Sequence, residues 1–208
     1  MKNLYYSYSL TKMKKIKTFF LKEIAEIRSG YLFSSGIQNE KQGNTKIIQL
    51  KDMDDFGRLR YKDLVTVKMD TPKELYLLKK GDVLFKAKSN KNIAGVLDKD
   101  VGTTIPTAHY FIIKLKKPLV LPEYLAWFIN QKPARKYLEM TSEGTHTVRI
   151  VKKKVLDDME IAVPSLDIQE KIIGLYRLSL KEEEIIKKLL HKRKQFIEKA
   201  MLKVLDNG

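Results

Sequence analysis

Residues 163–205 read VPSLDIQEKIIGLYRLSLKEEEIIKKLLHKRKQFIEKAMLKVL, in which Pro164 is followed by about forty residues with no second proline. Pro164 suits a helix start, and Ser165 or Asp167 can accept hydrogen bonds from the first free amides. Glu170 follows Asp167 at the spacing of a capping box. The stretch predicts one helix of roughly 58 Å at about 1.5 Å per residue. A domain of this size does not need such a helix for its own core, so something else must cover it.

A heptad pattern places apolar side chains on one stripe of this helix. The stripe is interrupted by Ser179, Glu182 and Arg193, which we expect to set register and partner choice. Gly174 lies in the interior and can mark a bend. The pattern predicts a coiled-coil helix that pairs with a second copy or another protein, although a helix folded back on its own domain stays an alternative. The stripe residues are Ile168, Ile172, Leu175, Ile186, Leu189, Phe196 and Ala200.

The 208 residues suffice for one domain and one helical arm. We expect an N-terminal tail over residues 1–16, a globular domain over 17–163 and the long helix over 164–208. The chain has no cysteine, and its three histidines lack metal-ligand spacing, so neither disulfides nor a structural metal is expected. No export signal is evident, and we expect a cytoplasmic protein without a membrane association.

The net charge of +16 is concentrated in the globular part. Residues 1–150 contain 28 Lys and Arg against 15 Asp and Glu, whereas residues 151–208 contain 13 against 10. Neutralising phosphates releases counterions, so double-stranded DNA or another nucleic acid is the natural partner. A generally lysine-rich proteome would raise the isoelectric point without any such binding.

Short β-type runs alternate with turns through the middle of the chain. They cover 46–53, 58–69, 75–87, 92–98 and 107–115, and 155–163 predicts a last strand. Residues 17–30 predict a short amphipathic helix with Phe20, Ile24 and Ile27 on one face and Gly30 after its end. Helices are also predicted over 122–130 and 133–140. The fold class is therefore α+β, with a twisted mixed or antiparallel sheet followed by the long helix.

We find no constellation typical of catalysis. The chain lacks nucleotide-binding glycine loops, the G-x-S-x-G elbow and the H-E-x-x-H zinc motif. Asp157, Asp158 and Glu160 could form a nuclease metal site, but the alternation of Asp158 and Glu160 favours a solvated face. We therefore expect no catalytic residues, metal or cofactor.

Two polar loops have the chemistry of DNA contacts. Lysine suits phosphate oxygens, asparagine suits the adenine edge, and arginine suits guanine in a bidentate arrangement. Either loop can equally be a solvated turn. The candidate residues are Lys86, Lys88, Asn90, Lys91 and Asn92 in the first loop and Thr145, His146 and Arg149 in the second.

Several segments, in order, resemble the DNA-specificity (S) subunits of type I restriction-modification systems. These are LKEIAEIRSG (21–30), IIQLKDM (47–53), LKKGDVLFKAKS (78–89), PEYLAWFIN (122–130) and 143–172, which ends in PSLDIQEKI. The resemblance covers about residues 20–205. The family's usual Pro-Pro-Leu-x-Glu-Gln is here Pro-Ser-Leu-Asp-Ile-Gln (164–169), which keeps the first proline, the leucine and the glutamine.

The resemblance implies a target recognition domain followed by a spacer helix. Full specificity subunits have two of each, whereas this chain has one, so the resemblance implies a half-length subunit. Two copies would pair their helices antiparallel and recognise a palindromic, bipartite site as a homodimer.

The resemblance also implies the division of labour within the complex. This chain would recognise sequence and bind a DNA adenine methyltransferase (M) subunit, which a motor-nuclease (R) subunit can join, and it would be a non-catalytic subunit. The alternatives are a non-specific DNA-binding scaffold, a stand-alone DNA-binding protein with a coiled-coil arm, or a metal-dependent nuclease.

Overall fold

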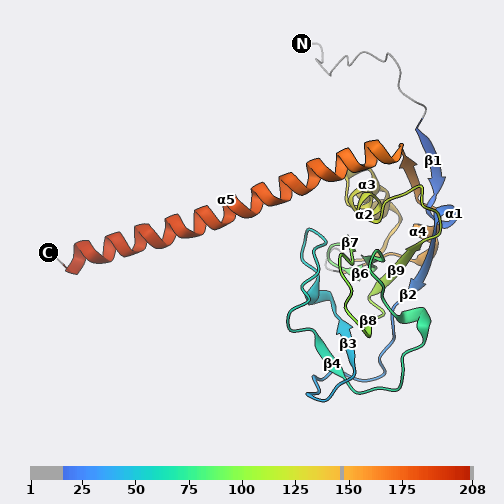
Figure 1. Ribbon diagram of the computed structural model, residues 1–208, viewed down its shortest axis with the longest axis horizontal. Helices are drawn as coiled ribbons and strands as arrows, with labels where there is room; N and C mark the ends of the chain where they lie inside the picture. Colours follow the sequence, from blue (N-terminus) through green and yellow to red (C-terminus); the bar gives the residue numbers. More distant parts are fainter. Residues whose placement is uncertain (1–15, 146–147, 207–208) are drawn as a thin grey trace, which may run out of the picture. The chain divides into compact units, whose positions relative to one another are not determined.

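The computed structural model describes residues 16–145 and 148–206, and it divides into two compact units (Figure 1). Within the described residues, the first unit ends at Leu166 and the second begins at Asp167. The expected tail over 1–16 lies outside the described residues except for Ile16. The α+β class is confirmed, with several small sheets in place of one.

A four-stranded antiparallel sheet forms the centre of the first unit, in the order β2-β9-β5-β7. Its strands are β2 (Ala25–Ser29), β5 (Val83–Lys86), β7 (Ala94–Val96) and β9 (Tyr110–Leu115). β5 and β9 are paired so that Leu84 lies opposite Ile112, and both side chains are fully buried. The two central strands of this sheet, β9 and β5, are therefore formed by apolar runs that are buried in the core.

A second sheet is mixed, because β3 pairs antiparallel with β4 and parallel with β8. The strands are β3 (Thr45–Ile48), β4 (Val65–Val67) and β8 (Thr104–Pro106), and short 3-10 turns lie at Leu50–Asp52 and Glu74–Tyr76. Successive side chains on β3 enter different clusters, since Ile47 packs with Val67 and Ile105, whereas Ile48 packs in the cluster of Leu84 and Ile112. β3 thus joins two parts of the core.

The remaining strands form two peripheral sheets. β1 (Lys17–Phe20) pairs with β12 (Glu160–Val163), and β11 (Arg149–Ile150) pairs with both β10 (Glu143–Gly144) and β6 (Lys88–Ser89). The last strand expected over 155–163 is shorter than predicted, because its first half forms α4 (Lys153–Asp157).

The helix predicted over residues 17–30 is wrong. These residues form β1, the single turn α1 (Leu21–Ile24) and β2. Ile24 and Ile27 are buried as expected, but Phe20 is 41% exposed. β1 pairs with β12 and β2 with β9, and these pairings satisfy the backbone hydrogen-bonding groups of both strands. This tertiary pairing outweighs the local preference for a helix. Gly30 lies where the chain passes Thr107, and a Cβ there would be 2.2 Å from the Thr107 carbonyl oxygen.

Two helices follow β9 as predicted, α2 (Pro122–Ile129) and α3 (Lys132–Thr141). α2 lies against β7 and β5. After α2, the Asn130 amide accepts a hydrogen bond from Ala94 N (2.8 Å) and donates one to Ala94 O (2.8 Å). The side chain thereby covers the free edge of β7, which would otherwise expose unpaired backbone groups.

The second unit is a single uninterrupted helix, α5 (Leu166–Asp206) (Figure 1). It begins directly after Ser165, close to the predicted start, and its 41 residues span roughly 60 Å. Gly174 does not interrupt it, and a Cβ there would meet open space.

Candidate nucleic-acid interface

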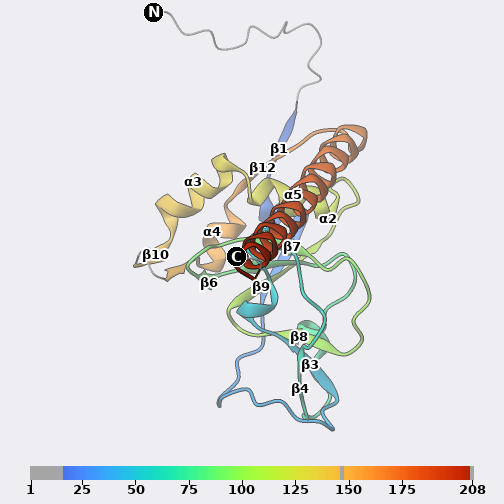
Figure 2. The same cartoon turned by 90° about the vertical axis from the view of Figure 1, so that its left-hand side faces the viewer.

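The two polar loops singled out in the sequence meet in the structure. Arg149 lies opposite Ser89 and Ile150 opposite Lys88, through the pairing of β11 with β6. Val151 N also donates to Ala87 O at 2.8 Å. Figure 2 shows β6 and β10 at the same edge of the first unit. Residues far apart in the chain therefore share one surface.

Two of the candidate residues are internal supports of this surface. Lys86 is 6% exposed, and its Nζ donates to Met53 O at 2.7 Å. Burial holds the pKa of the Lys86 amine below its ordinary value, although nearby Asp55 opposes this shift. Asn92 Nδ2 donates to Lys86 O (2.8 Å) and Ala87 O (3.2 Å). Both side chains shape the loop; Lys86 is buried, whereas Asn92 is half-buried.

The other three residues of the first loop are exposed. Ser89 Oγ donates to Asn90 Oδ1 at 3.2 Å and accepts from Lys91 N at 3.3 Å, which orders the turn. The Asn90 side chain can still accept one more hydrogen bond at Oδ1 and donate hydrogen bonds from Nδ2. Lys91 Nζ forms an ion pair with Asp55.

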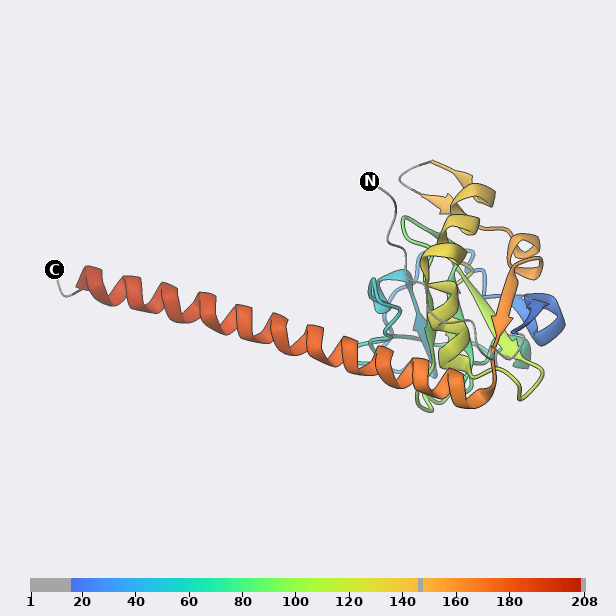
Figure 3. The ribbon, with the colours of Figure 1, turned by 90° about the horizontal axis from the view of Figure 1, so that it is seen from above.

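The second loop is the tip of the β10–β11 hairpin, which lies at the periphery of the first unit (Figure 3). Thr145 N donates to Val148 O at 3.0 Å, and Thr145 Oγ1 accepts from Val148 N at 3.3 Å. Gly144 supplies the turn with a φ of +109°. His146 lies outside the described residues.

Helix α3 brings a cation that was not among the residues expected from the sequence. Exposed Arg135 lines a small cleft with Asn90, Glu139 and Arg149. The basic cluster KPARK (132–136) on an amphipathic helix was the available signal. The cleft is small, with a volume of about 30 Å³. We call the exposed set the β6–β11 surface; it comprises Lys88, Asn90, Lys91, Arg135, Thr145 and Arg149.

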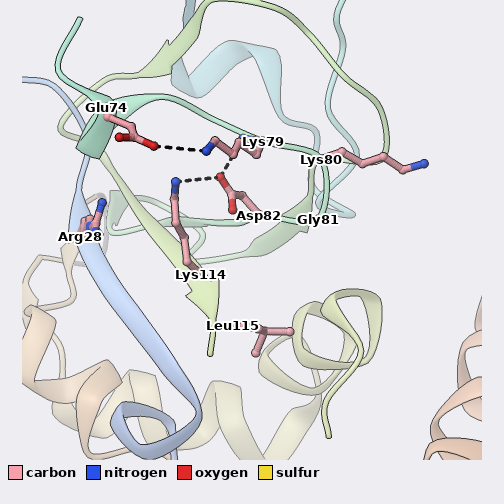
Figure 4. Close-up of a pocket in the computed structure, with 8 residues that line it drawn as sticks. All are labelled: Arg28, Glu74, Lys79, Lys80, Gly81, Asp82, Lys114 and Leu115. Atoms are coloured by element: carbon pink, nitrogen blue, oxygen red, sulfur yellow. Dashed lines mark hydrogen bonds and ion pairs between the residues drawn. The ribbon is translucent and has the colours of Figure 1, made fainter. Parts of the chain in front are cut away.

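A second basic region lies at the opposite end of β5, around a cleft of about 570 Å³. Figure 4 shows Lys114 pointing toward Asp82 (3.6 Å), Lys79 toward Glu74 (3.3 Å), and Lys80 extending away from both pairs. Burial raises the pKa of the Asp82 carboxyl despite hydrogen bonding from Lys79 N and the charge of Lys114. Its two carboxylates, Glu74 and Asp82, offset half of its four cations, which are Arg28, Lys79, Lys80 and Lys114.

The acidic group near β12 engages lysines. Asp157 pairs with Lys153 and Asp158 with Lys22, both at 2.7 Å. The Lys22 hydrogen bond holds the pKa of Asp158 below its usual range. Within residues 16–145 and 148–206, no three His, Cys, Asp or Glu side chains are arranged to hold a metal ion.

Apolar side chains are exposed along α5. Of the predicted stripe, Ile172 is half-buried and the other six residues are exposed. Further exposed apolar residues flank the stripe, among them Leu178, Ile185, Leu190, Ile197 and Met201. In the described part of the chain, no helix combines the length and apolarity that a membrane span requires.

A cationic surface that also carries amide and hydroxyl groups has the chemistry of a nucleic-acid-binding protein. The chain matches the family described as type I restriction modification DNA specificity domain over residues 13–192, and it belongs to that family. The resemblance seen in the sequence is thus confirmed. Specificity subunits are generally non-catalytic and recognise DNA within restriction-modification complexes.

Several solved structures share the fold at low identity. The HsdS subunit from Thermoanaerobacter tengcongensis has a TM-score of 0.60 and 14% identity over 88% of this chain. The S subunit from M. genitalium has a TM-score of 0.54 and 15% identity over 84%. A structure described as the basis of complex assembly and conformational transition of the type I R-M system has a TM-score of 0.62 and 15% identity over 86%.

The chain spans 41% of the M. genitalium subunit and 42% of the other two chains. No curated protein sequence matches it significantly.

Proposed function

We propose that the chain recognises a DNA sequence through the β6–β11 surface, as the specificity subunit of a type I-like restriction-modification complex. The observation that carries this proposal is the pairing of β11 with β6, which joins two loops of DNA-contacting composition. Arg135 adds a cation from a third element. The surface around Arg149 thus combines three cations, which suit phosphates, with an amide and a hydroxyl, which suit bases.

The contacts divide by chemistry. Lys88, Lys91 and Arg135 suit phosphate oxygens, which position the duplex without selecting a sequence. Asn90 and Arg149 suit purine edges in the major groove, and the Thr145 hydroxyl suits either kind of contact. His146 stays a candidate for the same surface.

We further propose that α5 assembles the complex. Its exposed apolar stripe matches a helix that pairs antiparallel with α5 of a second copy. The two-fold homodimer would then hold two identical recognition domains apart and recognise a bipartite palindrome. The flanking apolar residues widen the stripe beyond a two-helix seam, which leaves contact area for helices of a methyltransferase subunit.

Under this proposal the chain itself performs no chemistry and needs no cofactor. A DNA adenine methyltransferase subunit would modify the site, and a motor-nuclease subunit can join the same complex. Because the host's DNA is in the cytoplasm, the chain would act there.

Selection from random duplex DNA tests the recognition function. The full chain, alone and with its methyltransferase subunit, is incubated with the pool, and bound duplexes are sequenced. We expect an enriched motif with two half-sites. Binding without any enriched motif would contradict the proposal and favour the non-specific scaffold. Magnesium-dependent cleavage by the purified chain alone would favour the nuclease alternative instead.

A further inference from the structure

We propose that Glu139 is a specificity-determining positioning residue, which holds Arg149 in the orientation that recognises guanine. The inference rests on the proposed DNA-recognition function and deepens it. Glu139 Oε1 lies 3.2 Å from Arg149 Nη1, at the rim of the small cleft that also contains Asn90.

The carboxylate is held by a well-packed helix. On α3, Ala134 and Leu138 are buried at 5% and 2% exposure, next to exposed Glu139. Tyr137 OH donates to Val155 O at 3.0 Å and ties α3 to α4. Glu139 therefore projects from a backbone whose position does not depend on Arg149.

The guanidinium is held from the other side by the register of β11. Arg149 lies opposite Ser89 on β6, and β6 continues from β5 of the central sheet. Both partners of the ion pair thus project from separately anchored elements. A side chain ordered before binding loses less conformational freedom when it contacts DNA, and such preorganisation favours the complex.

The ion pair leaves the guanidinium enough capacity for a base. Arginine has five N–H donors, and a single Nη1 contact to Glu139 leaves a pair of donors for guanine O6 and N7. The carboxylate also offsets the arginine charge, so Arg149 attracts phosphates less than an unpaired cation would.

A matched carboxylate serves as the control. Glu143 on β10 pairs with Lys152 at 2.5 Å and is exposed like Glu139, but its carboxylate is engaged by that lysine and not by Arg149. Glu139→Ala and Glu143→Ala therefore remove the same charge from the same surface. Glu139→Gln keeps an acceptor at the position of Oε1 and is the conservative variant.

The test sequences duplexes selected from a random pool by the full chain and by each variant. We expect the wild type to enrich a motif containing guanine, Glu139→Ala to lose about tenfold of the preference for that guanine, and Glu139→Gln to restore much of it. In an Arg149→Ala background, Glu139→Ala should have no further effect. Affinity for an unrelated duplex should rise to a similar extent in Glu139→Ala and Glu143→Ala, because each removes one negative charge, and the melting temperature should stay unchanged.

Two results would overturn the inference while leaving DNA recognition intact. One is a Glu139→Ala motif identical to that of the wild type. The other is an equal loss of preference for Glu143→Ala, which would indicate a general charge effect. A wild-type chain that enriches no motif would overturn both the inference and the function on which it rests.

Discussion

Arg149 lies directly opposite Ser89 in the antiparallel pairing of β11 with β6, although β7, β8, β9, α2, α3 and β10 separate the two residues in the sequence. This pairing places the guanidinium beside the Asn90 amide at one cleft. The two side chains best suited to purine edges, Asn90 and Arg149, therefore lie together on the β6–β11 surface although they come from different loops.

Replacing Arg149 by alanine should weaken specific DNA binding by about 1–3 kcal/mol and relax the preference at one position of each half-site. Arg149→Lys should not restore the preference, because an ammonium lacks the planar pair of donors. Titration of the selected duplex and of single-base variants measures both effects. Unchanged specificity in Arg149→Ala would remove this residue from the recognition surface.

Lys88→Ala should lower affinity by the same factor for every sequence. The slope of log K against log salt should become shallower by about 0.9 for each phosphate that the lysine no longer neutralises. Lys86→Met is the control, since the Lys86 amine is buried on the Met53 carbonyl and should not contribute to binding. A weaker affinity with a flatter salt dependence in Lys86→Met would show that the buried amine reaches DNA after all.

Gly30→Ala should destabilise the domain by about 1–3 kcal/mol, because backbone atoms leave no space for a methyl group. The new Cβ would lie 2.2 Å from Thr107 O and 2.7 Å from Pro106 O. Gly36→Ala, whose Cβ meets nothing within 4 Å, should change stability by at most about 0.5 kcal/mol. Urea unfolding followed by circular dichroism compares the two, and equal stabilities would contradict the tight approach.

Charges placed on the α5 stripe should prevent self-association. Combining Ile186→Lys with Leu189→Lys should raise the dimer dissociation constant at least about 100-fold, because buried apolar contacts are replaced by charges. Glu198→Lys, two residues from both Phe196 and Ala200, lies away from the stripe and should leave assembly intact. Sedimentation equilibrium measures the masses, and a wild-type monomer at high concentration would show that α5 pairs only with another protein.

Local sequence determined the elements that depend on neighbouring residues. Pro164 and the long run of helix-forming residues predicted α5, and Pro122 with its apolar face predicted α2. The glycine turns and β-type runs predicted three strands of the central sheet, β5, β7 and β9, but not β2. Each of these signals repeats with the period of the structure that it forms, so no distant partner is needed to recognise it.

Only the tertiary structure decided which segments lie together. Residues 17–20 became a strand because β12, near the other end of the domain, pairs with them. Lys86 can be buried because the Met53 carbonyl accepts a hydrogen bond from its amine. Arg135 lines the cleft because α3 lies beside the β10–β11 hairpin. The sequence by itself determined the composition of the DNA-contacting loops and the long helix. Their union into one surface depended on long-range strand pairing, whose hydrogen bonds leave no periodic trace in either loop.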